Sequence, residues 1–169
     1  MQLYRNFLCF IFLLFSSGVL AMEISMPNFT AGGILPAKYT VDGAGVSPEL
    51  NWRDVPKDCK SLVLICEDPD APLGLWTHWI VYNLPPNATG LVEGVRDLPA
   101  GAQFGLNTIQ EPSYCPPAPP KGEHRYYFKL YALDVVLDLK KPTRDELMKA
   151  MKGHIVVQAS LLTKYQRPF

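Results

Sequence analysis

The residues best suited to chemistry lie close together, in the stretch EDPDAPLGLWTHW at positions 67–79. Asp68 and Asp70 flank a proline, and His78 follows between two tryptophans. Carboxylates and an imidazole at this spacing could bind a metal, act as an acid/base pair or line a ligand pocket. Asp-Pro-Asp is also a common turn signal, because aspartate accepts hydrogen bonds from nearby backbone amides. The motif alone leaves all four interpretations open.

The segments around this motif predict a mainly β fold. SLVLICE (61–67) is a continuous apolar run of strand length, typical of a strand buried on both faces. Residues 76–84, 125–133 and 154–165 are further strand candidates, rich in aromatic and β-branched side chains. Since proline and glycine turns separate these runs, we expect antiparallel sheets in one domain.

One helix and one long loop are also predicted. Thr143 and Glu146 have the spacing of a capping box, and Gly153 ends the helix that follows. Residues 97–123 show little periodicity. A loop of this length inside a compact domain is often a ligand-binding loop.

Strand periodicity indicates which side chains share a face. Trp76 and His78 are two residues apart, which places Thr77 and Trp79 on the opposite face. His124 and Tyr126 share a face of the later strand by the same rule. We therefore expect these segments to converge with the Asp-Pro-Asp turn on one pocket.

The N-terminal segment predicts export. Arg5 precedes an apolar run over 7–15, and Ala21 is suitably placed for cleavage before Met22. The apolar run is short for a membrane span, which needs about 20 residues. We predict a signal peptide over 1–21, a single mature domain over 22–169 with no integral membrane segment, and a periplasmic or secreted location.

Charge and cysteine content limit the partners. The chain carries 16 basic and 16 acidic residues, which gives no argument for nucleic acid. After cleavage three cysteines remain, Cys59, Cys66 and Cys115, so one disulfide or none is possible. A bridge across a single strand is geometrically awkward, so any bridge is expected to include Cys115. Oligomeric state stays open between monomer and homodimer.

Four motifs together resemble a known family. SPELNW (47–52), DPDAP (68–72), Trp-x-His (76–78) and PPKGEHRYYF (119–128) look like the phosphatidylethanolamine-binding proteins, in particular the bacterial branch described as Raf-kinase-inhibitor-like. The resemblance covers essentially the whole mature chain. It implies a central antiparallel sheet packed against a smaller sheet, a few peripheral helices, and a small cavity for phosphate, phosphoethanolamine or acetate.

The resemblance also implies which residues bind the ligand: Asp68, Asp70, Pro72, Trp76, His78, Tyr114, Ala118, Pro119, His124 and Tyr126. One departure concerns Ala118, which stands where relatives carry glycine or cysteine. Because alanine tolerates fewer backbone conformations than glycine, the geometry of the rim there is an open question.

Such a pocket would accept an anion through its histidines. An imidazole beside a carboxylate is favoured in its charged form, so we expect raised pKa values for His78 and His124. No cofactor and no enzymatic activity are expected, since no nucleophile motif is present. Three alternatives remain: a metal site using the same side chains, catalysis through Cys115, and a protein-interaction module that inhibits a kinase or protease.

Overall fold

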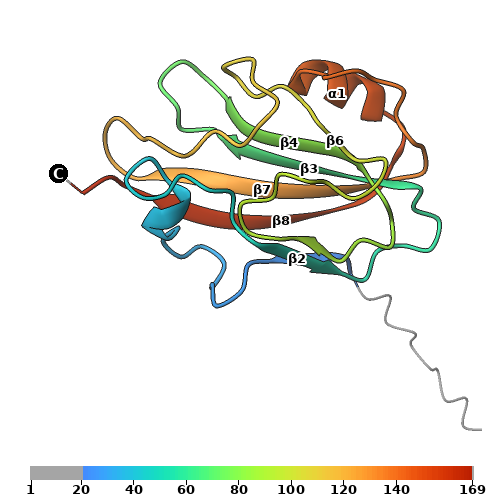
Figure 1. Ribbon diagram of the computed structural model, residues 1–169, viewed down its shortest axis with the longest axis horizontal. Helices are drawn as coiled ribbons and strands as arrows, with labels where there is room; N and C mark the ends of the chain where they lie inside the picture. The colour runs from blue at the N-terminus through green and yellow to red at the C-terminus, as the bar shows by residue number, and fades with distance from the viewer. Residues whose placement is uncertain (1–20, 169) are drawn as a thin grey trace, which may run out of the picture.

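The computed structural model describes residues 21–168, and the predicted signal peptide lies almost entirely outside this range. Two antiparallel sheets make up the fold (Figure 1). The larger has five strands in the order β6 (Gln103–Phe104), β4 (Trp76–Leu84), β3 (Ser61–Asp68), β7 (His124–Leu133) and β8 (Ile155–Tyr165). The smaller has three, in the order β1 (Glu23–Ser25), β2 (Leu50–Arg53) and β5 (Gly90–Leu91). The mainly β prediction, with a central and a smaller sheet, is confirmed.

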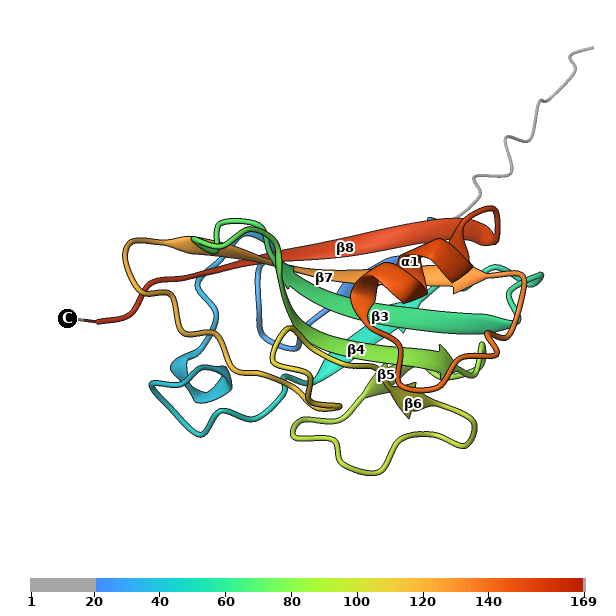
Figure 2. The same cartoon turned by 90° about the horizontal axis from the view of Figure 1, so that it is seen from above.

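The central strand β3 is buried at every residue because both faces of the large sheet are covered. Leu62, Leu64 and Cys66 belong to the larger core, which the small sheet closes. Val63 and Ile65 alternate with them and belong to a second core. The helix α1 (Arg144–Met151) closes this second core on the side opposite β2 (Figures 1 and 2). A continuous apolar run is therefore what this position in the fold requires.

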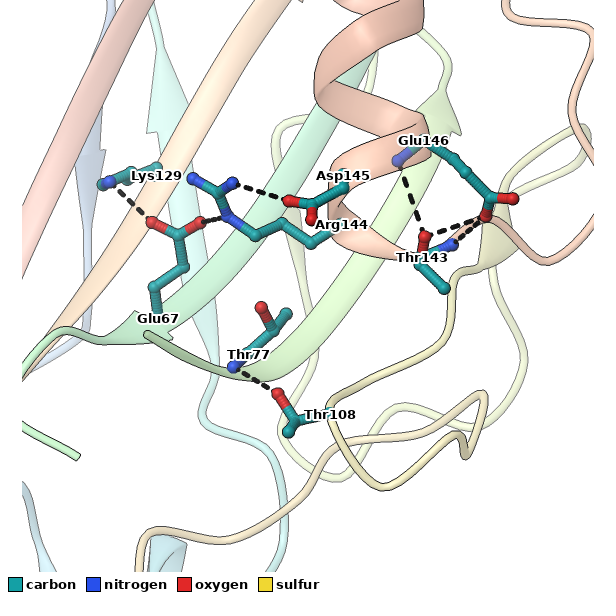
Figure 3. A network of polar contacts seen from close by, with 8 residues as sticks. All are labelled: Glu67, Thr77, Thr108, Lys129, Thr143, Arg144, Asp145 and Glu146. Atoms are coloured by element: carbon teal, nitrogen blue, oxygen red, sulfur yellow. Dashed lines mark hydrogen bonds and ion pairs between the residues drawn. The ribbon is translucent and has the colours of Figure 1, made fainter. Parts of the chain in front are cut away.

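Helix α1 begins as the sequence predicts. The Thr143 side chain accepts from the backbone N–H of Glu146, and the Glu146 carboxylate accepts from the backbone N–H of Thr143 at 2.8 Å (Figure 3). Gly153, just after the helix, has a φ of 84°. A short 3₁₀ helix, η1 (Ala37–Tyr39), is the other helical element among the described residues.

A buried carboxylate fastens α1 to the sheet. Glu67 on β3 is 1% exposed and accepts from Lys129 on β7 at 2.6 Å and from the guanidinium of Arg144 on α1 (Figure 3). A carboxylate this deep in a protein needs such partners, because desolvation strongly disfavours an unpaired charge.

The three cysteines that remain after residue 21 are free thiols. Cys59 and Cys66 are buried, and Cys115 is half-buried. The bridge through Cys115 that the sequence left open does not form here. Within residues 21–168, no helix has the length and apolar character needed to cross a bilayer.

Candidate ligand-binding site

A cavity of about 410 Å³ opens where β3, β4 and β7 end beside the proline-rich loop. Its lining comprises Asp68, Ala71, Pro72, Leu73, Trp76, His78, Cys115, Pro116, Ala118, Pro119, Pro120 and His124. Most of these side chains are apolar, so the few polar groups are set in a largely hydrocarbon wall. This combination is typical of small-ligand sites.

Asp68 and His124 form the polar base of the cavity. The Nδ1 of His124 lies 2.8 Å from Oδ2 of Asp68, and both side chains are buried. The other carboxylate oxygen, Oδ1, accepts from the backbone N–H of Asp70 at 2.8 Å. Since Nδ1 is committed to Asp68, Nε2 is the ring nitrogen of His124 that remains for a ligand.

His78 is held by backbone groups rather than by a carboxylate. Its Nδ1 lies 2.7 Å from the carbonyl oxygen of Cys115, which can only accept, so Nδ1 carries the proton and donates. The backbone N–H of Cys115 donates in return to the carbonyl of His78 at 2.8 Å. Among the described residues, Nε2 of His78 has no hydrogen-bond partner although it is buried.

The expected rise in the pKa of His78 is wrong. Burial lowers its pKa below the ordinary value of 6.5, and this outweighs the opposing effects of the Cys115 carbonyl and of the Asp68 charge. At neutral pH His78 is therefore an uncharged imidazole that presents an acceptor, Nε2, at the cavity.

A β-bulge places His78, and it also corrects the predicted strand faces. Cys66 pairs with Trp79 and Glu67 with Thr77, so His78 is an extra residue between two pairs. The ring of His78 meets that of Tyr126 edge-on at a centroid distance of 5.3 Å. Trp79 packs in the same core as Tyr126. His78 and Trp79 thus lie toward one side of the sheet, and the prediction that Trp79 faces away is wrong.

Asp70 lies outside the cavity, although the sequence placed it among the ligand-binding residues. Its carboxylate accepts from the backbone N–H and the Nε of Arg125 at 2.9 Å each, and from Nη2 at 2.7 Å. The Arg125 guanidinium lowers the pKa of Asp70 to about 2. This clamp fastens the Asp-Pro-Asp turn to β7 one residue away from His124, so Asp70 positions the site rather than lining it.

The two predicted tyrosines also lie outside the cavity lining. Tyr126 is fully buried under the ring of His78, and its hydroxyl has no partner within residues 21–168. Burial raises the pKa of this phenol far above its ordinary value. Tyr114 donates its hydroxyl to the carbonyl of Tyr39 at 2.8 Å, and its ring packs edge-on against Trp79. Tyr114 therefore supports the loop from within the core.

The predicted long loop is held against the edge of β4 by backbone hydrogen bonds. Gly105 N–H donates to the Ile80 carbonyl at 3.1 Å, and Thr108 N–H donates to the Thr77 carbonyl at 3.0 Å. The Cys115 contacts described above complete this attachment. The loop then delivers Ala118 and Pro119 to the cavity as predicted. Ala118 lies outside the set of non-glycine residues with positive φ, so the rim there does not need glycine.

Some lining residues carry no sequence signal of their own. Ala71, Leu73, Pro116 and Pro120 line the cavity without a chemically distinctive side chain. Leu73 is 92% exposed at the tip of the turn that follows Asp70. An apolar residue in a turn is the signal that could have marked it, because such turns are usually polar.

The arrangement favours binding of a small polar group. In the described part of the chain, no group of three or more His, Cys, Asp or Glu side chains has a metal-binding arrangement. The Cys115 thiol has its pKa raised, chiefly by burial, which disfavours the reactive thiolate. The groups of the cavity that can contact a ligand are two imidazoles, one carboxylate and an apolar wall.

Comparisons with known proteins agree with the fold. A sequence model of the family "Phosphatidylethanolamine-binding protein" matches residues 25–166. A UPF0098 protein of Chlamydia trachomatis is 49% identical over 152 residues, covering 86% of this chain and 99% of its own length. A UPF0098 protein of Methanothermobacter thermautotrophicus is 46% identical over 150 residues, with the same coverage.

Two solved structures superpose on nearly the whole described chain. A putative phosphatidylethanolamine-binding protein homologue from Chlamydia trachomatis has a TM-score of 0.83 and 48% identity, covering 88% of this chain and 99% of its own. E. coli YbcL, described as a new member of the mammalian PEBP family, has a TM-score of 0.82 and 26% identity, covering 88% of this chain and 100% of its own. By sequence and by fold, this chain belongs to the phosphatidylethanolamine-binding protein family.

Proposed function

We propose that this protein binds a small anionic group, of the phosphate or phosphoethanolamine kind, in the cavity beside Asp68, His78 and His124. The observation that carries the proposal is that the cavity contains two buried histidines, His78 and His124. In each, the protein engages Nδ1, and Nε2 is the nitrogen available to a ligand. Two nitrogens held in this way are preorganised for a ligand, because their orientation is fixed before binding.

The charge state of His78 sets how an anion would be held. In its neutral form Nε2 accepts, so it suits a ligand that still carries a proton, such as a monoprotonated phosphate. Once protonated, the same nitrogen donates to an anionic oxygen. Affinity for phosphate is therefore expected to rise as the pH falls through the histidine range.

Asp68 does not repel such an anion as strongly as a free carboxylate would. One of its oxygens accepts from His124 and the other from the Asp70 backbone N–H. Its charge is thus spread over two donors on the protein side of the cavity. Because Nδ1 of His124 is engaged by this carboxylate, Nε2 is the ring nitrogen left to contact the ligand.

Titration calorimetry with inorganic phosphate and with phosphoethanolamine tests the proposal. We expect His124→Ala to weaken binding at least tenfold, since it removes the ring nitrogen that faces the ligand and leaves Asp68 without its partner. His154→Ala is the matched control, because His154 forms an exposed pair with Asp134 far from the cavity. Equal affinity for the wild-type protein and the His124→Ala variant would refute the proposal.

A second function is favoured by the turn at the cavity mouth. Leu73 is 92% exposed and Leu75 is 44% exposed, which is unusual for leucines so close together. They suit a protein-interaction module in which the cavity regulates binding to a kinase or protease. Leu75→Asn, at an exposed residue outside the cavity lining, would then abolish inhibition of a responsive enzyme in a panel, while phosphate binding stays unchanged.

Export is part of the same proposal, and the predicted signal peptide over 1–21 supports it. Expression of the full chain in a bacterial host, followed by fractionation and mass spectrometry, tests it. We expect a mature chain that begins at Met22 in the periplasmic fraction. An uncleaved chain in the cytoplasm would contradict this.

A further inference from the structure

A second pocket lies where the loop after β6 meets the start of α1, and we call it the α1 groove. Its volume is about 330 Å³. Its lining comes from Leu75 and Thr77, from residues between 106 and 110, and from residues 143–145. It shares no lining residue with the cavity beside His124, so the two pockets are separate.

The large sheet lies between the two pockets. Thr77 pairs directly with Glu67, so these two side chains share a face, and Glu67 contacts Arg144 on α1. Trp76 pairs with Asp68, and both of these residues line the cavity. Because successive side chains of a strand alternate, the α1 groove and the cavity open on opposite faces of the sheet.

The hydroxyl of Thr77 is a buried polar group with no partner. Thr77 is 4% exposed and lines the α1 groove. Its backbone is engaged, because its N–H donates to the Thr108 hydroxyl oxygen at 2.8 Å and its carbonyl accepts from the Thr108 N–H at 3.0 Å (Figure 3). Its own hydroxyl makes no hydrogen bond to any residue in 21–168. Since buried hydroxyls normally have a partner, this one points to a ligand in the groove.

The neighbouring groups that remain for a ligand are chiefly donors. The oxygen of the Thr108 hydroxyl accepts from Thr77, which leaves its proton free to donate. Arg144 donates Nε to Glu67 and Nη1 to Asp145, and Nη2 has no partner within the described range. The first backbone N–H groups of α1 have no acceptor inside the helix. Donors gathered in this way suit a ligand that presents acceptors, and a guanidinium among them favours an anion.

The local charge favours a singly charged anion. Lys129 and Arg144 balance the carboxylates of Glu67 and Asp145, so this network is neutral as a whole. The Asp145 side chain is 92% exposed, so water and salt screen its repulsion of an anion. One added negative charge is thus tolerated better than two.

We propose that the α1 groove binds a small organic acid. The carboxylate would accept from Arg144 and from the hydroxyls of Thr77 and Thr108. Its short alkyl chain would cover Leu75 and Leu106, which also line the groove, and Leu75 is 44% exposed without a ligand. A carboxylate fits better than inorganic phosphate, because phosphate has no apolar part for this wall.

Nuclear magnetic resonance with sodium butyrate tests the proposal. In a titration at neutral pH to tens of millimolar, we expect saturable shifts of the Thr77, Thr108 and Arg144 amides. n-Butanol has the same chain without the carboxylate, so it should leave these amides unchanged. Butyrate shifts that do not saturate, or that are confined to the His78 and Cys115 amides of the cavity, would overturn the proposal.

Variants assign the binding to named groups. Thr77→Val keeps the shape and the backbone bonds but removes the hydroxyl, so the dissociation constant for butyrate should rise at least threefold. Thr30→Val is the matched control, since Thr30 is exposed and lies outside the groove lining. Arg144→Gln should raise the constant at least tenfold. Because Arg144→Gln also removes a partner of Glu67, thermal unfolding is measured alongside. A constant that neither Thr77→Val nor Arg144→Gln changes would refute the proposal.

His124→Ala separates the groove from the cavity. His124 lies outside the groove lining, so a His124→Ala variant with a dispersed spectrum should keep the butyrate shifts of Thr77 and Thr108. The same variant is expected to lose phosphate affinity, which tests the proposed function independently. Loss of the butyrate shifts in this folded variant would place butyrate in the cavity and overturn the groove as its site.

Discussion

Asp68 and His124 meet across the ends of β3 and β7, with Oδ2 2.8 Å from Nδ1 and both side chains buried. They are 56 residues apart in sequence, and the adjacent strands β3 and β7 bring them together. The pair links the stability of the fold to the chemistry of the cavity, because either partner alone would be a buried polar group without its main contact.

Asp68→Asn tests that link. The substitution removes the carboxylate oxygen that pairs with Nδ1 of His124, so we expect at least tenfold weaker phosphate binding and a loss of unfolding free energy on the order of 2 kcal/mol. Calorimetry and urea unfolding measure the two effects. Asp134→Asn is the control, because the Asp134–His154 pair is exposed and should change stability by less than about 0.5 kcal/mol. A similar loss in both variants would argue against a special role for the buried pair.

Asp70→Asn is predicted to act on stability more than on binding. The pKa of Asp70 is lowered from 3.8 to about 2, so its stabilising effect is present above pH 3.8 and is lost as the pH falls toward 2. Unfolding free energy measured across that window should fall less steeply in the variant. Phosphate affinity at neutral pH should change less than in Asp68→Asn. A larger loss of affinity than in Asp68→Asn would show that Asp70 contacts the ligand.

The lowered pKa of His78 gives the folding stability a second pH dependence, at higher pH than that of Asp70. Since burial lowers its pKa below 6.5, the unfolded chain binds the proton more readily than the folded one. Its contribution to stability is therefore present above pH 6.5 and is lost as the pH falls through the lowered pKa. His78→Gln should remove this part of the profile. Added phosphate should restore stability at acid pH in the wild type, if it binds the protonated imidazole.

Glu67→Gln is expected to destabilise the fold without affecting the cavity. The substitution removes the carboxylate that accepts from both Lys129 and Arg144 and leaves two cations near each other. We expect a loss of about 2–4 kcal/mol in urea unfolding. Phosphate affinity should stay within twofold of the wild type, because Glu67 points toward α1 (Figure 3) and alternates along β3 with Asp68, which lines the cavity. A large loss of affinity would reveal coupling between the two faces.

Much of the fold follows from local pattern. The strand predicted over 76–84 has the same bounds in the structure, and those over 61–67, 125–133 and 154–165 differ by one residue at one end. Long apolar or aromatic runs bounded by proline turns can be recognised as strands from the sequence alone. The short strands β1, β2, β5 and β6 were not predicted, because two to four residues carry too little periodicity.

The site was harder to predict where tertiary structure decides. Asp68 and Asp70 both adjoin Pro69, yet only Asp68 reaches the cavity. The carboxylate of Asp70 instead pairs with Arg125, which is 55 residues away in sequence but lies on the neighbouring strand β7. The face of Trp79 was mispredicted because a bulge has no signature in WTHWIVY. The pKa of His78 was mispredicted because burial, which only the tertiary packing decides, lowers it by more than the Cys115 carbonyl and the Asp68 charge raise it.

The paired contacts between His78 and Cys115 have a consequence for engineering. Both protein groups that Cys115 supplies to His78 belong to the main chain, so this part of the wall does not depend on which side chain follows Tyr114. Proline alone would remove the donor. Libraries that vary residue 115 together with the turn at 71–73 can therefore reshape the cavity while the imidazole keeps its orientation.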